Sequence, residues 1–154
     1  MESRLGSRLF IDIDKNDKLP NIENRSVDMK KVLIIDDDQG IHAIIHVIVQ
    51  KRMPDCIFIS AYNGEEGIDI ATKKLPDAIL LDVEMPGIDG YETCRRLKAD
   101  SITAHIPVII FTGMAADTEG MSAARDCGAD ALLAKPISKD ALTEKIEELL
   151  EKGV

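Results

Sequence analysis

The 154-residue chain contains no tryptophan, only 3% aromatic residues and no long apolar run. Without a stretch of about 20 apolar residues it has no candidate transmembrane helix, and its N-terminus lacks the apolar segment of a signal peptide. Its three cysteines form no C-x-x-C unit, and we interpret them as reduced packing residues: Cys56, Cys94 and Cys127. These absences predict a cytoplasmic protein without a membrane partner.

Positive charge is also scarce, because 28 acidic residues outnumber 19 basic residues and give a net charge of −9. Nucleic acid is therefore not expected as a direct partner, since phosphate binding requires clusters of lysine and arginine. Residues 1–30 hold six acidic and six basic residues, so the net charge falls entirely on the rest of the chain. This shift predicts an N-terminal extension or linker over residues 1–29 and one domain over residues 30–154.

The extension contains one motif with the ligand spacing of a calcium loop. Its acidic and amide residues stand at the first, third, fifth and twelfth positions: Asp12, Asp14, Asn16 and Glu23. However, Asp17 occupies the position that requires glycine, Pro20 lies inside the loop, and no amphipathic helix flanks it. A polar linker is therefore the better interpretation.

From residue 31 onward, short apolar segments alternate with segments of helical periodicity. The pattern predicts strands at 32–35, 56–61, 78–82, 107–112 and 131–134, and helices at about 39–52, 64–75, 91–99, 117–127 and 139–151. The strands are apolar throughout, which is typical of a parallel sheet covered by helices on both faces. The sequence thus predicts an α/β fold: a flavodoxin-like, doubly wound, five-stranded parallel sheet of the (βα)5 type.

Polar residues stand where four of these strands end: Asp36 and Asp37, Asp82, Thr112, and Lys135. Ligands of open α/β sheets bind at this edge. Three carboxylates there would repel one another unless a cation lay among them, and a site made only of oxygen ligands suits Mg²⁺ or Mn²⁺. A hydroxyl and an ammonium group are suited to bind phosphoryl oxygens, which would place Asp82 to attack phosphorus and form an acyl phosphate.

Four motifs contain these residues: Ile-Ile-Asp36-Asp37-Asp38, Asp82-x-x-Met-Pro-Gly-x-Asp-Gly, Ile-Pro107-Val-Ile-Ile-Phe-Thr112, and Gly128-Ala-Asp-Ala-Leu-Leu-Ala-Lys135-Pro136. Together they resemble the CheY-like receiver domain of two-component response regulators, over Lys31 to about Leu150. The resemblance implies that Asp82 accepts a phosphoryl group from a sensor histidine kinase or a histidine phosphotransfer protein. The domain would then catalyse its own phosphorylation and dephosphorylation without being a conventional enzyme.

The same resemblance implies roles for the neighbouring residues. Asp37, Asp82 and the backbone carbonyl of Glu84 would hold Mg²⁺, with Asp36 in support through water. Thr112 and Lys135 would bind the phosphoryl oxygens. The Lys135–Pro136 peptide bond would be cis, as is typical of the family.

One position departs from the family pattern: Leu132 stands three residues before Lys135, where the family usually carries an aromatic residue. Leucine can pack inward but cannot present a ring to a partner. Output is therefore expected through backbone shifts around Thr112–Met114 and the helix that follows. Glu84 and Met114 flank the site and are expected to tune the rate of dephosphorylation.

The leading interpretation is a phosphorylation switch, either a single-domain regulator or the receiver portion of a longer protein, since no output domain is recognised in these residues. An alternative is a pseudo-receiver, a protein-binding module that never cycles phosphate; only Leu132 favours it. An aspartyl phosphatase would use Glu84 as its general acid, although the Met-Pro-Gly that follows matches the receiver motif. A nucleotide-binding enzyme would need a glycine-rich loop after the first strand, where three aspartates stand instead.

Two histidines, His42 and His46, lie one turn apart on the first predicted helix, a spacing that can bind zinc. No third ligand is evident. We therefore expect exposed polar positions on a partner-facing helix, with the buried stripe formed by Ile41, Ile44, Ile45 and Ile48.

Overall fold

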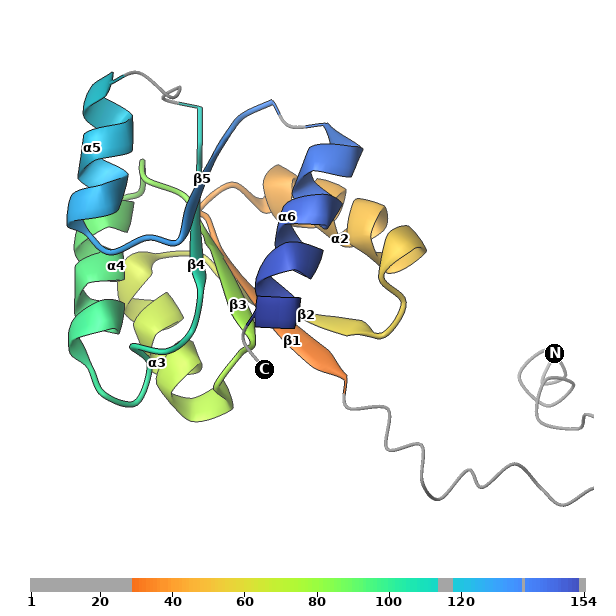
Figure 1. Ribbon diagram of the computed structural model, residues 1–154, viewed down its shortest axis with the longest axis horizontal. Helices are drawn as coiled ribbons and strands as arrows, with labels where there is room; N and C mark the ends of the chain where they lie inside the picture. The colour runs from red at the N-terminus through yellow and green to blue at the C-terminus, as the bar shows by residue number, and fades with distance from the viewer. Residues whose placement is uncertain (1–28, 114–117, 137, 153–154) are drawn as a thin grey trace, which may run out of the picture.

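The computed structural model describes residues 29–113, 118–136 and 138–152. It contains a central sheet with helices on both sides (Figure 1). The calcium-like motif of the extension lies outside the described residues. In chain order the elements are β1 (Lys30–Ile35), α2 (Gln39–Arg52), β2 (Cys56–Ala61), α3 (Gly64–Lys74), β3 (Ala78–Leu81), α4 (Gly90–Ala99), β4 (Val108–Thr112), α5 (Thr118–Asp126), β5 (Ala131–Ala134) and α6 (Lys139–Lys152).

The five strands are parallel and lie in the order β2-β1-β3-β4-β5. The chain moves outward from β1 to β2, then returns to the other side of β1 and continues through β3, β4 and β5. The predicted doubly wound sheet is therefore confirmed, and its strand order reverses between β1 and β3. Ile35 is paired with Leu81, and Leu81 with Ile110, so the carboxyl ends of the three central strands lie level with one another.

Alternate residues of the strands point to opposite faces, and each face packs against its own helices. Leu33 and Ile35 belong to the cluster that includes Ala71 of α3, and Leu97 of α4. Val32 and Ile34 belong to the cluster with residues of α2 and α6 (Ile45, Val49, Leu142, Ile146). Figure 1 shows the same division, with α3, α4 and α5 on one side of the sheet and α2 and α6 on the other. This double covering explains why the central strands are apolar on both faces.

Several local predictions are confirmed. The Asn63 side chain accepts a hydrogen bond from the N–H of Glu66 at 2.8 Å, and the Ser138 hydroxyl accepts one from the N–H of Ala141 at 3.0 Å. Both are N-caps of the kind that serine and asparagine provide. The Lys135–Pro136 peptide bond is cis. The three cysteines are free, and two of them are buried.

The prediction for the α2 surface is wrong at two positions. His42 was expected to be exposed but is only 6% exposed, whereas Ile44 was expected to be buried and is 57% exposed. The buried residues of α2 are His42, Ile45 and Val49, which follow one another at helical spacing. Because apolar residues occupy a wide arc of this helix, the sequence fitted more than one buried face, and the observed face is rotated toward His42. His46 is exposed, as expected.

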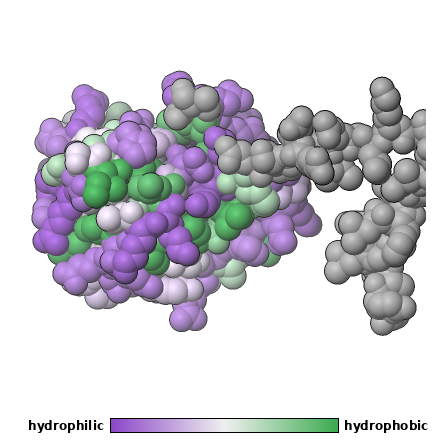
Figure 2. All heavy atoms as spheres, turned by 90° about the horizontal axis from the view of Figure 1, so that it is seen from below, coloured by the Kyte–Doolittle hydropathy of each residue, from purple (hydrophilic) through white to green (hydrophobic). Residues whose placement is uncertain are grey.

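Figure 2 views the molecule from the end opposite the carboxyl edge of the strands. Hydrophobic residues there stand in small groups among hydrophilic ones, which is ordinary for a protein surface. The exposed apolar side chains that precede strands at this end include Leu75, before β3, and Ile102, before β4. Within the described ranges, no helix is long and apolar enough to cross a lipid bilayer.

Candidate phosphoacceptor site

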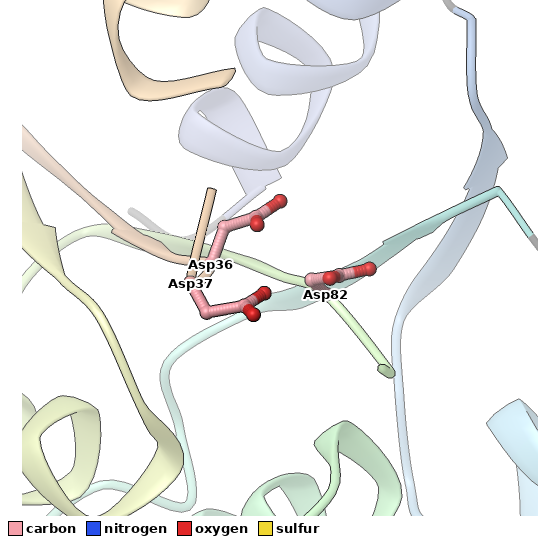
Figure 3. Close-up of side chains that lie close together, drawn as sticks. All are labelled: Asp36, Asp37 and Asp82. Atoms are coloured by element: carbon pink, nitrogen blue, oxygen red, sulfur yellow. The ribbon is translucent and has the colours of Figure 1, made fainter. Parts of the chain in front are cut away.

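Three aspartates meet at the carboxyl edge of the sheet, where the strand order reverses. Asp36 and Asp37 follow β1, and Asp82 follows β3 (Figure 3). One carboxylate oxygen from each residue lies within 4.8 Å of the others. Asp36 and Asp82 are buried, whereas Asp37 is exposed. The site is therefore an acidic cluster that is open to solvent at Asp37.

The position of Asp82 is fixed from the sheet side. Its N–H donates a hydrogen bond of 2.9 Å to the carbonyl of Ile35, which extends the β1–β3 pairing by one residue. After Asp82 the chain turns through Met85-Pro86-Gly87, and Gly87 has a φ of +82° that favours glycine. The turn ends the strand and leaves the Asp82 side chain at the edge of the sheet.

The following helix fixes Asp82 from the other side. Asp89 caps α4 by accepting a hydrogen bond of 2.8 Å from the N–H of Glu92. Gly90 then lies so close that a Cβ placed on it would be 2.1 Å from the Asp82 carbonyl oxygen. Only glycine allows α4 to begin against the Asp82 backbone.

Lys135 approaches the acidic cluster from the end of β5. Its Nζ lies 2.7 Å from an oxygen of Asp36 and 3.5 Å from an oxygen of Asp82. The same ammonium group lies 5.0 Å from the centre of the Phe111 ring, within the range of a cation–π contact. The second oxygen of Asp36 accepts a hydrogen bond of 2.9 Å from the N–H of Asp38. Both oxygens of Asp36 are thus already bound within the protein.

The electrostatic environment of Asp82 disfavours its charged form. Burial raises its pKa above the ordinary value, the charge of Asp36 raises it further, and Lys135 acts in the opposite direction. Burial alone would lower the pKa of Lys135, but its hydrogen bond to Asp36 and the charges of Asp36 and Asp82 outweigh that effect and raise it. Lys135 therefore stays charged, whereas a further cation would stabilise the charged form of Asp82.

The predicted site residues are brought together to different degrees. Asp36, Asp37, Asp82 and Lys135 form one cluster. Thr112 is 1% exposed at the end of β4, and its carbonyl accepts a hydrogen bond of 2.8 Å from the N–H of Lys135. Glu84 is exposed in the loop after β3. Met114 lies outside the described residues, so the expectation about its role remains a prediction.

Two residues at the site were not predicted from the sequence. Phe111 precedes Thr112 and carries the cation–π contact with Lys135; its apolar strand context gave no sign of this. His42 makes two hydrogen bonds behind the acidic cluster, one of them to the backbone of Asp36. A signal was present, since a histidine stood among the apolar residues of α2, but its partners are distant in sequence or belong to the backbone.

A doubly wound sheet with three aspartates and a lysine at its carboxyl edge defines the CheY-like class of signalling domains. The model of the response regulator receiver domain family matches residues 32–147, and the chain belongs to this family.

Individual relatives agree with this assignment. Sporulation initiation phosphotransferase F of Bacillus subtilis is 33% identical over 121 residues, which cover 79% of this chain and 94% of that protein. Protein PilH of Pseudomonas aeruginosa is 32% identical over 122 residues, which cover 79% and 98%. The crystal structure of a putative response regulator from Chloroflexus aurantiacus has a TM-score of 0.73 and 31% identity, and the match covers 79% and 98%.

Other curated relatives are considerably longer than the matched region. The match covers 51% of the probable transcriptional regulator ycf27 of Guillardia theta and 26% of response regulator PleD of Caulobacter vibrioides. The shared part is therefore the receiver domain, which relatives carry either nearly alone or beside further sequence.

Proposed function

We propose that this chain is a phosphoacceptor receiver of a two-component or phosphorelay system, in which Asp82 takes a phosphoryl group from a phosphohistidine. The main support for the proposal is the acidic cluster with its neighbouring lysine. Asp82 stands at the edge of the sheet, beside two further carboxylates and within 3.5 Å of a lysine that stays charged. The donor would be a sensor histidine kinase or a histidine phosphotransfer protein.

The donor set suits a magnesium ion. Oxygen atoms of Asp36, Asp37 and Asp82 converge within 4.8 Å, and the exposed Asp37 leaves a route for a hydrated ion to enter. Asp37 and Asp82 would hold the ion together with the backbone carbonyl of Glu84, and Asp36 would assist through water. When bound, the ion would neutralise charge on the transferring phosphoryl group and on the carboxylates.

The protein residues then have separate tasks in the transfer. An oxygen of Asp82 attacks phosphorus while the bond from phosphorus to the histidine nitrogen breaks, which yields an acyl phosphate. The other nitrogen of the donor ring carries a proton during the transfer, so the ring leaves as a neutral imidazole. Lys135 lies close enough to Asp82 to bind a phosphoryl oxygen as a point charge. Thr112 would bind another phosphoryl oxygen through its hydroxyl.

The proposed change in the surface follows from these contacts. Lys135 is bound to Asp36 in the present structure, and a phosphoryl group on Asp82 would compete for its ammonium group. Leu132, the family's aromatic position, is half-buried in β5 and packs against the core cluster that contains Leu33. The signal would therefore reach a partner through the backbone around Thr112 and the start of α5.

The test is phosphorylation of the full chain by a small phosphodonor with and without Mg²⁺, read on a phosphate-affinity gel and by intact mass. The expected result is a Mg²⁺-dependent, base-labile gain of one phosphoryl group that is lost in Asp82→Asn. Asp69→Asn, which changes an exposed aspartate of α3, serves as the matched control and should be phosphorylated normally. A protein that binds Mg²⁺ but gains no phosphoryl group would instead be a pseudo-receiver.

A further inference from the structure

His42 contacts the backbone of Asp36 in the acidic cluster and joins three segments of the chain. It belongs to the first turn of α2 and is 6% exposed. Its Nε2 lies 2.7 Å from the carbonyl oxygen of Asp36, and its Nδ1 lies 2.9 Å from the hydroxyl oxygen of Ser60 in β2. The ring also lies 4.6 Å, between centres, from the ring of Tyr62. A histidine with both nitrogens hydrogen-bonded and its ring in contact with Tyr62 is held in a single orientation.

The chemistry of these partners assigns the proton on Nε2. A carbonyl oxygen can only accept, so Nε2 must carry the hydrogen and donate it to Asp36. In the neutral ring Nδ1 is then the acceptor, and the Ser60 hydroxyl donates to it. The Asp36 carbonyl therefore sets the tautomer of His42, and the Ser60 hydroxyl supports it by donating to Nδ1.

The bonded carbonyl belongs to the peptide that connects Asp36 to Asp37. The N–H of Asp36 donates to the Ala61 carbonyl at 3.1 Å, which is the last backbone hydrogen bond between this segment and β2 in the described part of the chain. Beyond that point the chain leaves the sheet, and a carbonyl there has no strand partner to fix its direction. His42 supplies the partner, and the plane of this peptide decides where the Cα of Asp37, and with it the Asp37 carboxylate, is placed.

The other contacts of Asp36 do not perform this task. Lys135 and the N–H of Asp38 bind the side chain of Asp36, not its carbonyl. We propose that His42 is a positioning residue for the acidic site, which holds the Asp36–Asp37 peptide so that the Asp37 carboxylate faces Asp82. The inference rests on the proposed function, because it concerns the cation site that the function requires.

The inference is tested by measuring Mg²⁺ affinity with titration calorimetry on the full chain. His42→Leu should raise the Kd for Mg²⁺ by about tenfold or more, the range found when the groups that orient metal ligands are removed. His42→Gln, which keeps an N–H donor on a side chain of similar reach, should stay within about threefold of the natural protein. Ser60→Ala should give a smaller rise, because only the orienting hydroxyl is lost.

Two control variants separate positioning from general damage. His46→Leu makes the same chemical change at an exposed position one turn along α2 and should leave the Kd unchanged. Ile45→Ala removes packing from the same buried face and should lower thermal stability without changing the Kd. Equal losses of Mg²⁺ affinity in His42→Leu and Ile45→Ala would overturn the inference, because burial alone would then explain the effect.

A kinetic measurement gives an independent readout. During phosphorylation by a small phosphodonor, His42→Leu should raise the Mg²⁺ concentration at half-maximal rate and leave the rate at saturating Mg²⁺ near that of the natural protein. A Kd for Mg²⁺ in His42→Leu equal to that of the natural protein would overturn the inference and leave the proposed function intact. If His42→Leu does not fold, the same result in Ser60→Ala would do so. A natural protein that binds no Mg²⁺ would overturn both.

Discussion

Lys135 donates a hydrogen bond of 2.7 Å to the carboxylate of Asp36, although 99 residues separate them in the sequence. The Asp36 side chain is 2% exposed and that of Lys135 is 19% exposed, so the pair is largely removed from water. A buried ion pair contributes little net stability against an apolar pair, but removal of one partner leaves the other charge buried without compensation. The pair therefore links the first strand to the last, and each buried charge depends on its partner for compensation.

The first prediction concerns this dependence. Lys135→Met should lower the free energy of unfolding by about 2 kcal/mol at neutral pH without divalent cations, because Asp36 would lose its counter-charge. Adding Asp36→Asn to Lys135→Met should restore at least about 1 kcal/mol of that loss, as expected for directly coupled residues. Urea unfolding of the two single variants and the double variant measures the coupling. Additive effects of the two substitutions would contradict the prediction.

The second prediction concerns Asp82 in the absence of metal. Its pKa is raised first by burial and then by Asp36, which means that the folded protein disfavours the charged form. Asp82→Asn should therefore raise Tm in the presence of a chelator by about 3 °C, the shift that corresponds to roughly 1 kcal/mol in a domain of this size. With excess Mg²⁺ the natural protein should gain more Tm than the variant, since ligand binding stabilises the folded state. A lower Tm for the variant in chelator would contradict the argument.

The third prediction is the pH dependence of the same comparison. A carboxyl group whose folded pKa lies above its ordinary value of 3.8 contributes stability below that value and loses it as the pH rises through the folded pKa. Without divalent cations, the stability advantage of Asp82→Asn should be smallest in acid and grow as the pH rises through the folded pKa of Asp82. Denaturant unfolding of both proteins at pH values below and above this pKa tests the sign of the pH dependence. A stability advantage that shrinks as the pH rises would refute the prediction.

Much of the fold and of the acidic cluster was predictable because both depend on local patterns. Strands buried on both faces are continuously apolar, and the residue after each strand must lie at one edge of a parallel sheet. The positions of Asp36, Asp82 and Lys135 followed from that rule alone. The cap residues Asn63 and Ser138 followed from equally local hydrogen bonding.

The remaining features depend on contacts that a strand-and-helix pattern does not specify. The rule for strand ends places Lys135 near two carboxylates, but only the packed structure shows that it binds Asp36 more closely than Asp82. Which arc of α2 is buried depends on its packing against the sheet and α6, so Ile44 was assigned to the wrong side. His42 was misjudged for the same reason, since its partners are a hydroxyl in β2 and a backbone carbonyl.

The last prediction concerns the backbone that supports Asp82. In Gly90→Ala the new methyl group would meet the Asp82 carbonyl oxygen at 2.1 Å and the Cα of Val83 at 2.8 Å, and neither atom belongs to a flexible side chain. The start of α4 must then move away from the end of β3, which should cost more than about 2 kcal/mol of stability. It should also weaken Mg²⁺ binding, because Asp82 moves with its backbone.

Gly113→Ala is the control for this change, because a Cβ at Gly113 meets no atom of the described residues within 4 Å and its φ lies outside the left-handed range. Its stability should stay within about 0.5 kcal/mol of the natural protein. Denaturant unfolding and Mg²⁺ titration of both variants complete the test. A Gly90→Ala protein with natural stability and natural Mg²⁺ affinity would show that the close approach of α4 is not what holds Asp82 in place.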